Sequence, residues 1–309
     1  MPDLLFPIKW LVELLLVAFH QLFTIFGLES SDGLTWVLAI TGLVLVVRAA
    51  LIPLFVRQIK SQRGMVLLQP ELQKLQKKYK GKNDRASREA FAKEQMELYK
   101  RTGSNPLSSC LPLLAQMPIF MSLFFVLNEA QHGKAGVGLL SAQLSSDFAH
   151  ATFFGAPLSE TFLTATTDAV RILAAVMVIL MTTSQFITQR QIISKNQTPA
   201  NLQNSQYMQT QKIMLWLFPI MFAISGISFP LGVMFYWLVS NFWTMGQQYV
   251  VIKRMPTPGS VAHEQRQAKL IAKGKITAPE IIEGEVPEEL KPEPKGQRSQ
   301  PTRKKPKKK

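Results

Sequence analysis

The sequence predicts an all-α integral membrane protein, with five membrane-spanning helices, a polar helical hairpin between the first two spans, and an amphipathic helix near the N-terminus. Three observations point to this class. The 309 residues are 47% apolar and yet carry a formal net charge of +15, a combination that single soluble domains rarely show. Several apolar stretches have the length of about 20 residues that crosses a bilayer. Stretches rich in Lys and Arg alternate with stretches poor in them, as in multi-pass proteins.

The first 33 residues are predicted to lie outside the cell, with residues 8–26 as an amphipathic helix. At 100° per residue, four polar side chains fall within about 60° of one another and form one stripe on an apolar cylinder. They are Lys9, Glu13, His20 and Thr24. This pattern favours a helix that lies in the membrane interface, anchored by Trp10, over the alternative of a spanning helix.

Residues 34–57 form the first predicted span. Before Arg57 it contains one charge, Arg48, which lies roughly 13 Å deeper in the membrane. A cation at that depth costs on the order of 3 kcal/mol and usually faces water or a partner. No Asp or Glu occurs in any predicted span, so Arg48 needs water, neutral polar groups, or a carbonyl such as that of Ala49, which Pro53 frees. We expect a hydrated, positively charged cavity in the membrane; the alternative is that Arg48 marks the end of a shorter span.

Residues 58–105 are predicted to form a cytosolic antiparallel helical hairpin. Together with Arg57 they contain 13 Lys or Arg and 5 acidic residues, too many charges to enter lipid. Apolar side chains recur at helical spacing on both sides of the turn sequence GKND: they are Leu68, Leu72, Leu75, Tyr79, Phe91, Met96, Leu98 and Tyr99. Asp84 is predicted to cap the second helix. The alternative is a solvated charged linker.

The rest of the chain alternates between apolar and polar segments. Pro112 and Pro118 predict kinks in the second span. In order, the segments are a second span (106–128), an extracytoplasmic loop (129–170), a third span (171–190), a cytosolic loop (191–212), the fourth and fifth spans (213–252) and a disordered basic cytosolic tail (253–309).

The basic residues predict the orientation of the chain in the membrane. The successive connections and the tail contain 13, 1, 3, 0 and 15 Lys or Arg. This alternation places the N-terminus outside and the C-terminus in the cytosol. A flexible polybasic tail suits the RNA phosphates of a ribosome; the alternative is that it holds anionic lipid headgroups.

Few residues suggest cofactor, metal or catalytic chemistry. The single Cys110 excludes an internal disulfide, and the four histidines lack metal-ligand spacing. No predicted span contains His, Asp, Glu or Lys, which argues against an intramembrane protease, and no P-loop occurs. We therefore expect no cofactor, no metal and no enzymatic activity.

Four motifs in register resemble the YidC family of membrane protein insertases. They are VVRAALIPLFVRQIKS, LQPELQKLQKKYK, NPLSSCLPLLAQMPIF and FPLGVMFYWLVSNFWTMGQQ, and the resemblance covers about residues 6–255. The short N-terminal segment is similar to that of actinobacterial members, which lack the large periplasmic domain. The resemblance implies a five-span insertase core in the bacterial cell membrane. Its helices enclose a hydrophilic groove open to the cytosol and to lipid, with the hairpin and the interfacial helix attached.

The resemblance also implies partners and site residues. The partners are nascent membrane proteins, the ribosome at the tail and hairpin, and the lipid bilayer, with or without the Sec translocon. Arg48 matches the groove arginine of the family, and Trp237 an aromatic that faces the substrate. Gln116 matches a polar position of the second span. In the third span the groove residue aligns with Gln185, Thr188 or Gln189.

The expected mechanism has no chemical step. Arg48 attracts the polar or acidic flank of a nascent segment into the groove, while the apolar part of that segment leaves sideways into lipid. Two alternatives are a small-anion transporter and a membrane assembly scaffold. Five spans do not divide into the equal halves typical of a transporter, and a scaffold needs no buried cation.

Overall fold

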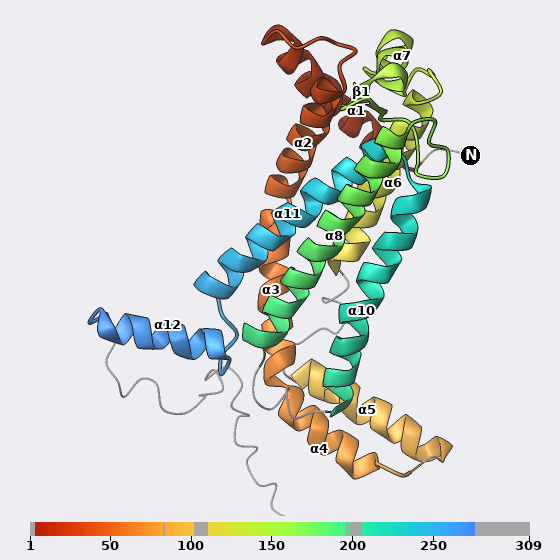
Figure 1. The fold of residues 1–309 in the computed structure, drawn as a ribbon. Coiled ribbons are helices and arrows are strands. Elements are labelled where there is room, and N and C mark those ends of the chain that lie inside the picture. The colour runs from red at the N-terminus through yellow and green to blue at the C-terminus, as the bar shows by residue number, and fades with distance from the viewer. Residues whose placement is uncertain (1–3, 83, 102–110, 196, 198–204, 276–309) are drawn as a thin grey trace, which may run out of the picture.

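The computed structural model describes residues 4–82, 84–101, 111–195, 197 and 205–275. The predicted features at Cys110, at the start of the second span, in part of the 191–212 loop and in the tail after residue 275 lie outside these residues. Figure 1 shows long helices in a bundle, with short elements at one end and α4, α5 and α12 at the other. The elements are α1 Phe6–Ile25, α2 Gly33–Ala50, α3 Ile52–Leu67, α4 Gln69–Tyr79, α5 Arg85–Arg101, α6 Leu111–Ala130, α7 Ala142–His150, β1 Thr152–Phe153, β2 Ala156–Pro157, α8 Asp168–Lys195, α10 Ser205–Ser228, α11 Leu231–Arg254 and α12 Val261–Ala272.

Each long helix packs mainly against one or two neighbouring helices, and the helices do not surround one common axis. Helix α11 contacts both α2 and α8, and α8 also packs along α10. Helix α1 joins α2 to α6, which touches α11 more lightly. Three described helices, α1, α2 and α8, are long and apolar enough to cross a membrane. The fold is therefore all-α apart from one small hairpin, with several apolar helices, as expected for a membrane protein.

The polar stripe of α1 is buried inside the protein. Its side chains Lys9, Glu13 and His20 are at most 8% exposed. The Glu13 carboxylate accepts hydrogen bonds from the backbone N–H groups of Val137 and Gly138, at 2.8 and 2.6 Å. The outward face is apolar and includes Trp10, Leu11, Leu22, Ile25 and Phe26. Protein groups therefore satisfy the polar atoms of the stripe, and its interfacial position stays a prediction.

The first predicted span is two helices rather than one. Helix α2 ends at Ala50, and α3 starts at Ile52 with Pro53 in its first turn. A proline fits there because the first N–H groups of a helix have no intrahelical acceptor. The N–H of Leu51 turns back to the carbonyls of Val47 and Ala49. The Ala49 carbonyl, expected to be free, thus has a donor.

The segment between α6 and α8 contains structure that the sequence analysis treated as a loop. Helix α7 is capped by Ser141, whose Oγ accepts from the N–H of Leu144. The strands β1 and β2 pair around Phe154 and Gly155, both at positive φ. Gly33 lies against this hairpin, and a Cβ at that position would come within 2.4 Å of the Thr152 backbone. These elements cover one end of the bundle.

The main hydrophobic core lies at that covered end. Trp36 is fully buried, with its ring centroid 4.2 Å from that of His20 and 5.2 Å from that of Phe148. Its Nε1 donates to the Ser30 carbonyl, at 3.0 Å. Other fully buried members come from five further elements or segments, namely Leu16, Leu123, Leu140, Leu158, Met181 and Met234. The core at this end therefore joins residues of the long helices to residues of the segment that covers them.

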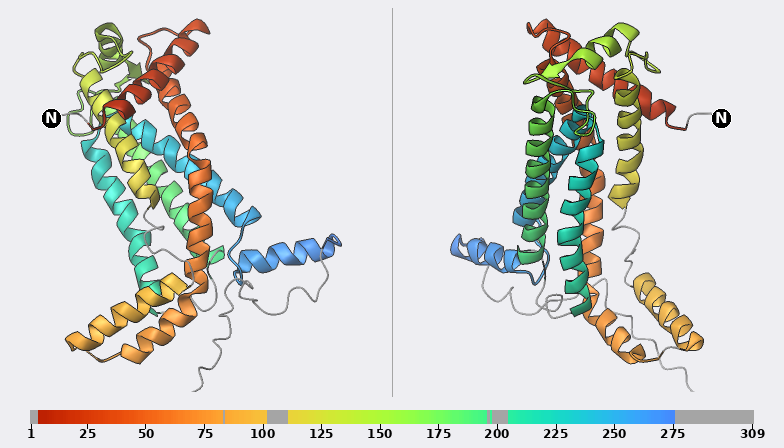
Figure 2. Two further views of the ribbon diagram at one scale, coloured as in Figure 1. Left: turned by 180° about the vertical axis from the view of Figure 1, so that it is seen from behind. Right: turned by 45° about the vertical axis from the view of Figure 1, so that its right-hand side comes forward.

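Helices α4 and α5 lie side by side as an antiparallel pair, as the views in Figure 2 show. Leu68, Leu72 and Leu98 are buried between them, with Tyr99 packed against the group. Asp84 accepts a hydrogen bond from the N–H of Ser87 at 2.8 Å, the geometry of a helix cap. Hydrogen bonds from the Ser87 side chain and then from its backbone N–H lower the pKa of the Asp84 carboxyl.

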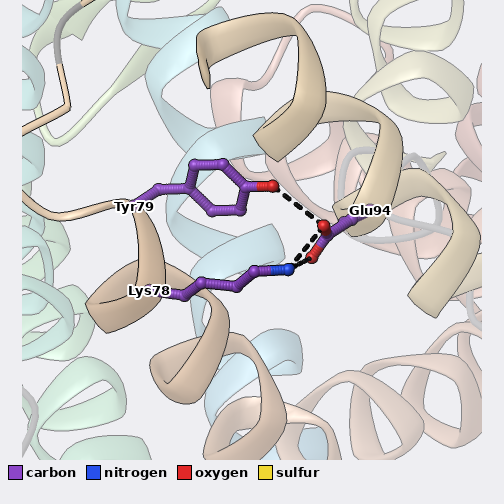
Figure 3. A network of polar contacts seen from close by, with 3 residues as sticks. All are labelled: Lys78, Tyr79 and Glu94. Atoms are coloured by element: carbon purple, nitrogen blue, oxygen red, sulfur yellow. Dashed lines mark hydrogen bonds and ion pairs between the residues drawn. The ribbon is translucent and has the colours of Figure 1, made fainter.

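A polar contact joins the two helices near their turn (Figure 3). The Lys78 ammonium lies 2.6 and 2.7 Å from the two oxygens of Glu94, and the Tyr79 hydroxyl donates to Glu94 at 2.8 Å. The hydrogen bond from Lys78 lowers the pKa of Glu94, and the same bond raises the pKa of Lys78. All three groups are solvent-accessible, so their contribution to stability is small.

The segment after α11 does not remain irregular. The sequence analysis predicted a flexible arm from residue 253, but residues 261–272 form α12, with Ser260 Oγ accepting from the N–H of His263. Thr257 and Ser260 are at most 2% exposed in the connection. The prediction is corrected for residues 253–275, because packing on α8 and α11 supplies the order that composition alone does not.

Candidate functional site

Arg48 lies in the last turn of α2, directly before the break between α2 and α3. Its side chain is partly exposed. The guanidinium carbon is 5.9 Å from the ring centroid of Phe55, across the break. No Asp or Glu among the described residues forms an ion pair with Arg48. A cation with this surrounding can receive an anionic or polar group from outside the chain.

Two further helices bring polar groups to Arg48. The Tyr236 side chain on α11 is 2% exposed and lies in the neighbourhood of Arg48. The Gln116 amide on α6 donates a hydrogen bond to the Tyr236 hydroxyl. The other amide atom, Gln116 Oε1, is buried and has no hydrogen-bond partner among the described residues. We call Arg48, Gln116 and Tyr236 the polar cluster.

Trp237 follows Tyr236 and forms an aromatic wall beside the polar cluster. Its ring stacks on that of Phe120, one turn after Gln116, with a centroid distance of 5.2 Å and an interplanar angle of 18°. The ring of Phe229 meets it edge-on, with a centroid distance of 4.8 Å. Trp237 remains partly exposed. The structure thus places Arg48, Gln116 and Trp237, predicted from three different segments, on neighbouring surfaces.

The three candidates of the third span lie on α8, on the far side of α11 from α2. Thr188 is 5% exposed, and its hydroxyl donates to the Ser184 carbonyl of its own helix at 2.8 Å. Gln185 and Gln189 keep partly exposed side chains. Because Thr188 is buried, the two glutamines are the more accessible of the three side chains.

Tyr236 is the site residue that sequence reasoning missed. It stands in the aromatic run FYW at 235–237, where the pattern does not distinguish a core ring from a site ring. Its hydroxyl is the atom that links Gln116 to the neighbourhood of Arg48. The hydroxyl of Tyr236 and the amide of Gln116 lie on different helices, so their pairing becomes visible only when α6 and α11 are placed side by side.

An apolar groove with a volume of about 710 Å³ lies between α3 and α11, beginning one helical turn after Arg48. Its lining includes Ile52, Val56, Phe242 and Val250. Gly246 also lines it, and without a side chain this residue leaves the helix backbone accessible. The site therefore combines a cation and an amide oxygen with an adjacent apolar surface, which suits an amphipathic ligand. The described residues contain no group of three His, Cys, Asp or Glu side chains that could hold a metal ion.

Comparison with known proteins identifies related sequences. A model of the family described as 60Kd inner membrane protein matches residues 27–258. Three relatives are each named membrane protein insertase YidC. The one from Streptomyces avermitilis is 44% identical over 283 residues, the one from Tropheryma whipplei strain Twist 41% over 312, and the one from Bifidobacterium longum 36% over 271.

The coverage differs between these relatives. The matches include 87%, 98% and 86% of this chain, in the same order. This chain spans 63% of the Streptomyces avermitilis relative, which is under two thirds, but 95% of the Tropheryma whipplei relative and 80% of the Bifidobacterium longum relative. The family match includes the polar cluster, the aromatic wall and the apolar groove.

Proposed function

The chain belongs to the YidC family of membrane protein insertases, and from this we propose that it inserts nascent membrane proteins into the bacterial cell membrane, alone or beside the Sec translocon. The protein acts as an insertase and chaperone, without a chemical step or a cofactor. Arg48 is the residue that receives the polar or acidic flank of the substrate. The single observation that carries this proposal is a cation at the end of an apolar helix that has no carboxylate partner among the described residues.

The polar cluster supports a role in substrate binding. A cation without a carboxylate partner, and a buried amide oxygen with no hydrogen-bond partner among the described residues, are costly unless a ligand or water completes them. The acidic flank of a substrate brings negative charge to Arg48 in surroundings of low dielectric constant, where attraction is stronger than in water. The groove between α3 and α11 then offers the apolar part of the substrate a surface next to lipid. A membrane potential that is positive outside adds about 2.3 kcal/mol per acidic charge per 100 mV.

The proposed topology has five spans, with the N-terminus outside and the C-terminus in the cytosol. The spans are α2 with the start of α3, α6, α8, α10 and α11. Helix α1 lies in the outer interface, supported by its apolar outward face and by the polar atoms that it buries against the protein. The hairpin of α4 and α5, with its excess of Lys and Arg, lies in the cytosol.

Site-specific photo-crosslinking tests the function. A photoreactive amino acid replaces Trp237 in the full chain, and membranes containing it are presented with ribosome-bound nascent membrane proteins. Trp36 is the matched control, because it is also a tryptophan in an apolar helix but is fully buried. Crosslinks to the nascent chain are expected from position 237 and not from position 36. Equal yields, or none from position 237, would remove the polar cluster from the substrate path.

The chain after α12 is proposed to bind the ribosome. Residues 276–309 contain nine Lys or Arg and six acidic residues, and the basic ones gather at the end, PTRKKPKKK. Such a segment binds RNA phosphates by releasing counterions, so its affinity falls steeply with salt. Deleting residues 276–309 leaves α12 intact and is expected to weaken ribosome co-sedimentation most at low salt. Unchanged co-sedimentation at every salt concentration would argue that the hairpin or the bundle binds instead.

A further inference from the structure

A second pocket lies where α12 crosses the ends of α8 and α11, away from the polar cluster. It has a volume of about 430 Å³. Five cationic side chains line it, from three helices: Lys195, Lys253, Arg266, Lys269 and Lys273. No Asp or Glu is among the lining residues. A pocket with this charge selects anions.

These cations are not used within the protein. None of the five forms an ion pair with a carboxylate of the described residues. Among the described residues, the side chain of Lys253 lies over the Tyr249 ring, with Nζ 5.7 Å from its centroid. Five positive charges held together repel one another, and a bound anion would relieve that repulsion.

The pocket also has an apolar part. Ile252 and Ala262 are at most 8% exposed, and Leu270 lies beside them in the lining. Both α8 and α11 are apolar through most of their length and carry basic residues in the last turn, Lys195 in α8 and Lys253 with Arg254 in α11. In a membrane protein the change from apolar to basic residues marks the level of the lipid headgroups. Tyrosine residues such as Tyr249 are also enriched at that level.

The position of α12 is fixed rather than incidental. Figure 1 shows this helix lying across the bundle direction, at the end where α8 and α11 stop. Its connection to α11 is anchored by the buried residues Thr257 and Ser260, and the Ser260 N–H donates to the Thr257 carbonyl at 3.1 Å. The cations of α12 are therefore held over those of α8 and α11.

We propose that this pocket binds the phosphate headgroup of an anionic glycerophospholipid, with the acyl chains lying along Ile252 and Leu270. Basic pockets at the ends of membrane helices on the cytosolic side hold such headgroups. The volume fits one headgroup and not an extended RNA backbone, and the apolar lining favours a lipid over free phosphate. The bound lipid joins α12 to the bundle and neutralises the cations there.

Lipid binding to the purified full-length protein tests the proposal. Native mass spectrometry in detergent counts the lipids bound while diphosphatidylglycerol, phosphatidylglycerol or phosphatidylcholine is titrated. The pocket variant combines Lys195→Gln, Arg266→Gln and Lys269→Gln. The control variant removes the same number of exposed cations from α4 and α5, by Lys77→Gln, Lys93→Gln and Lys100→Gln. The affinity for the anionic lipids is expected to fall by roughly ten- to a hundredfold in the pocket variant alone.

Several outcomes would overturn the proposal. They are an unchanged affinity in the pocket variant, an equal loss in the control variant, and equal binding of the zwitterionic phosphatidylcholine. Displacement of the lipid by millimolar inorganic phosphate would assign the site to free phosphate, and displacement by a short RNA at equal concentration would assign it to nucleic acid. The variant Lys195→Arg with Lys269→Arg keeps the charges and is expected to bind lipid normally, which separates lost charge from lost folding.

Discussion

The two ends of the bundle are packed differently, although the same helices build both. We call the end covered by α7 and the β-hairpin the closed end, and the end around Arg48 the open end. In α2, nearly every residue from Gly33 to Val44 is buried, whereas none from Leu45 to Ala50 is. In α11, eight of the ten residues 231–240 are buried, whereas none of residues 241–250 is.

In α2 this difference follows from the position along the helix, because both halves are apolar and hydropathy does not separate them. In α11 the composition changes as well, since the second half contains Asn241, Thr244, Gln247 and Gln248. At the closed end the neighbours and the 131–167 segment fill the space between the helices. At the open end that cover is missing among the described residues, and the polar cluster and the apolar groove lie there. The closed end is a rigid base for the open one.

The largest effect is expected from breaking the closed end. Trp36→Ala removes a fully buried indole and its hydrogen bond to the Ser30 carbonyl, so it should destabilise the protein by about 3–5 kcal/mol. Thermal unfolding in detergent measures this loss. Trp216→Ala on α10 is the control, since Trp216 is 64% exposed and should cost less than about 1 kcal/mol. Similar costs at the two positions would contradict the packing difference.

The open end should respond to charge rather than to volume. Arg48→Glu places a like charge opposite the acidic flank of a substrate, and insertion of such substrates is expected to fall by at least about tenfold. Arg48→Lys keeps the cation and should retain most activity. The measurement is the insertion of reporter proteins with acidic or neutral translocated tails into vesicles. Arg57→Glu, at an exposed position in α3, is the control. Normal insertion of substrates with acidic tails by the Arg48→Glu variant would refute the electrostatic role of Arg48.

Labelling with a thiol reagent sharpens the comparison along a single helix. In a Cys110→Ser background, Ala49→Cys at the open end of α2 should react with a membrane-impermeant maleimide added on the cytosolic side. Ile40→Cys, nine residues earlier and fully buried, should not react from either side. Reaction of Ala49→Cys from outside would indicate a pore, and failure to react at all would indicate a dry bundle.

The smallest effect is expected in the hairpin of α4 and α5. Its contact between Lys78 and Glu94 lowers the pKa of Glu94, so this stabilisation is complete above the ordinary carboxyl pKa of about 4.3 and is lost as the pH falls through the lowered value. The raised pKa of Lys78 has the opposite consequence, a loss as the pH rises through the raised value. Glu94→Gln should therefore slightly reduce the hydrogen-exchange protection of α4 at neutral pH and remove its acid dependence. An unaltered acid dependence in that variant would assign it to another carboxyl.

Much of the fold could be predicted from the sequence. Of the three described helices that are long and apolar enough to cross a membrane, α2 and α8 lie in predicted spans, because about 20 apolar residues in a row have few other ways to satisfy their backbone in lipid. The heptad-like spacing around GKND predicted the helices of the hairpin, and Leu68, Leu72 and Leu98 are indeed buried together. The break at Leu51 escaped prediction, since Pro53 fits both a kinked helix and the start of a new one.

The candidate site could be predicted in part. Arg48 stood out because a lone charge in an apolar run is costly, and the family resemblance pointed to Gln116 and Trp237. Tyr236 did not stand out, and the Thr188 hydroxyl proved to be bonded to its own helix. Roles for these residues in substrate binding stay predictions.

The sequence by itself determined where the long apolar helices and the hairpin helices lie, though not α7 or α12, where charge is concentrated, and that Arg48 has no acidic residue in the apolar spans. These properties follow from hydropathy and spacing within one segment. The tertiary structure alone decided that the polar stripe of α1 faces the protein, that Tyr236 meets Gln116, and that α12 brings its cations to those of α8 and α11. The physical reason is that each of these contacts joins residues far apart in the chain. Burial and pairing between helices depend on which faces meet, and the pattern within one helix does not specify this.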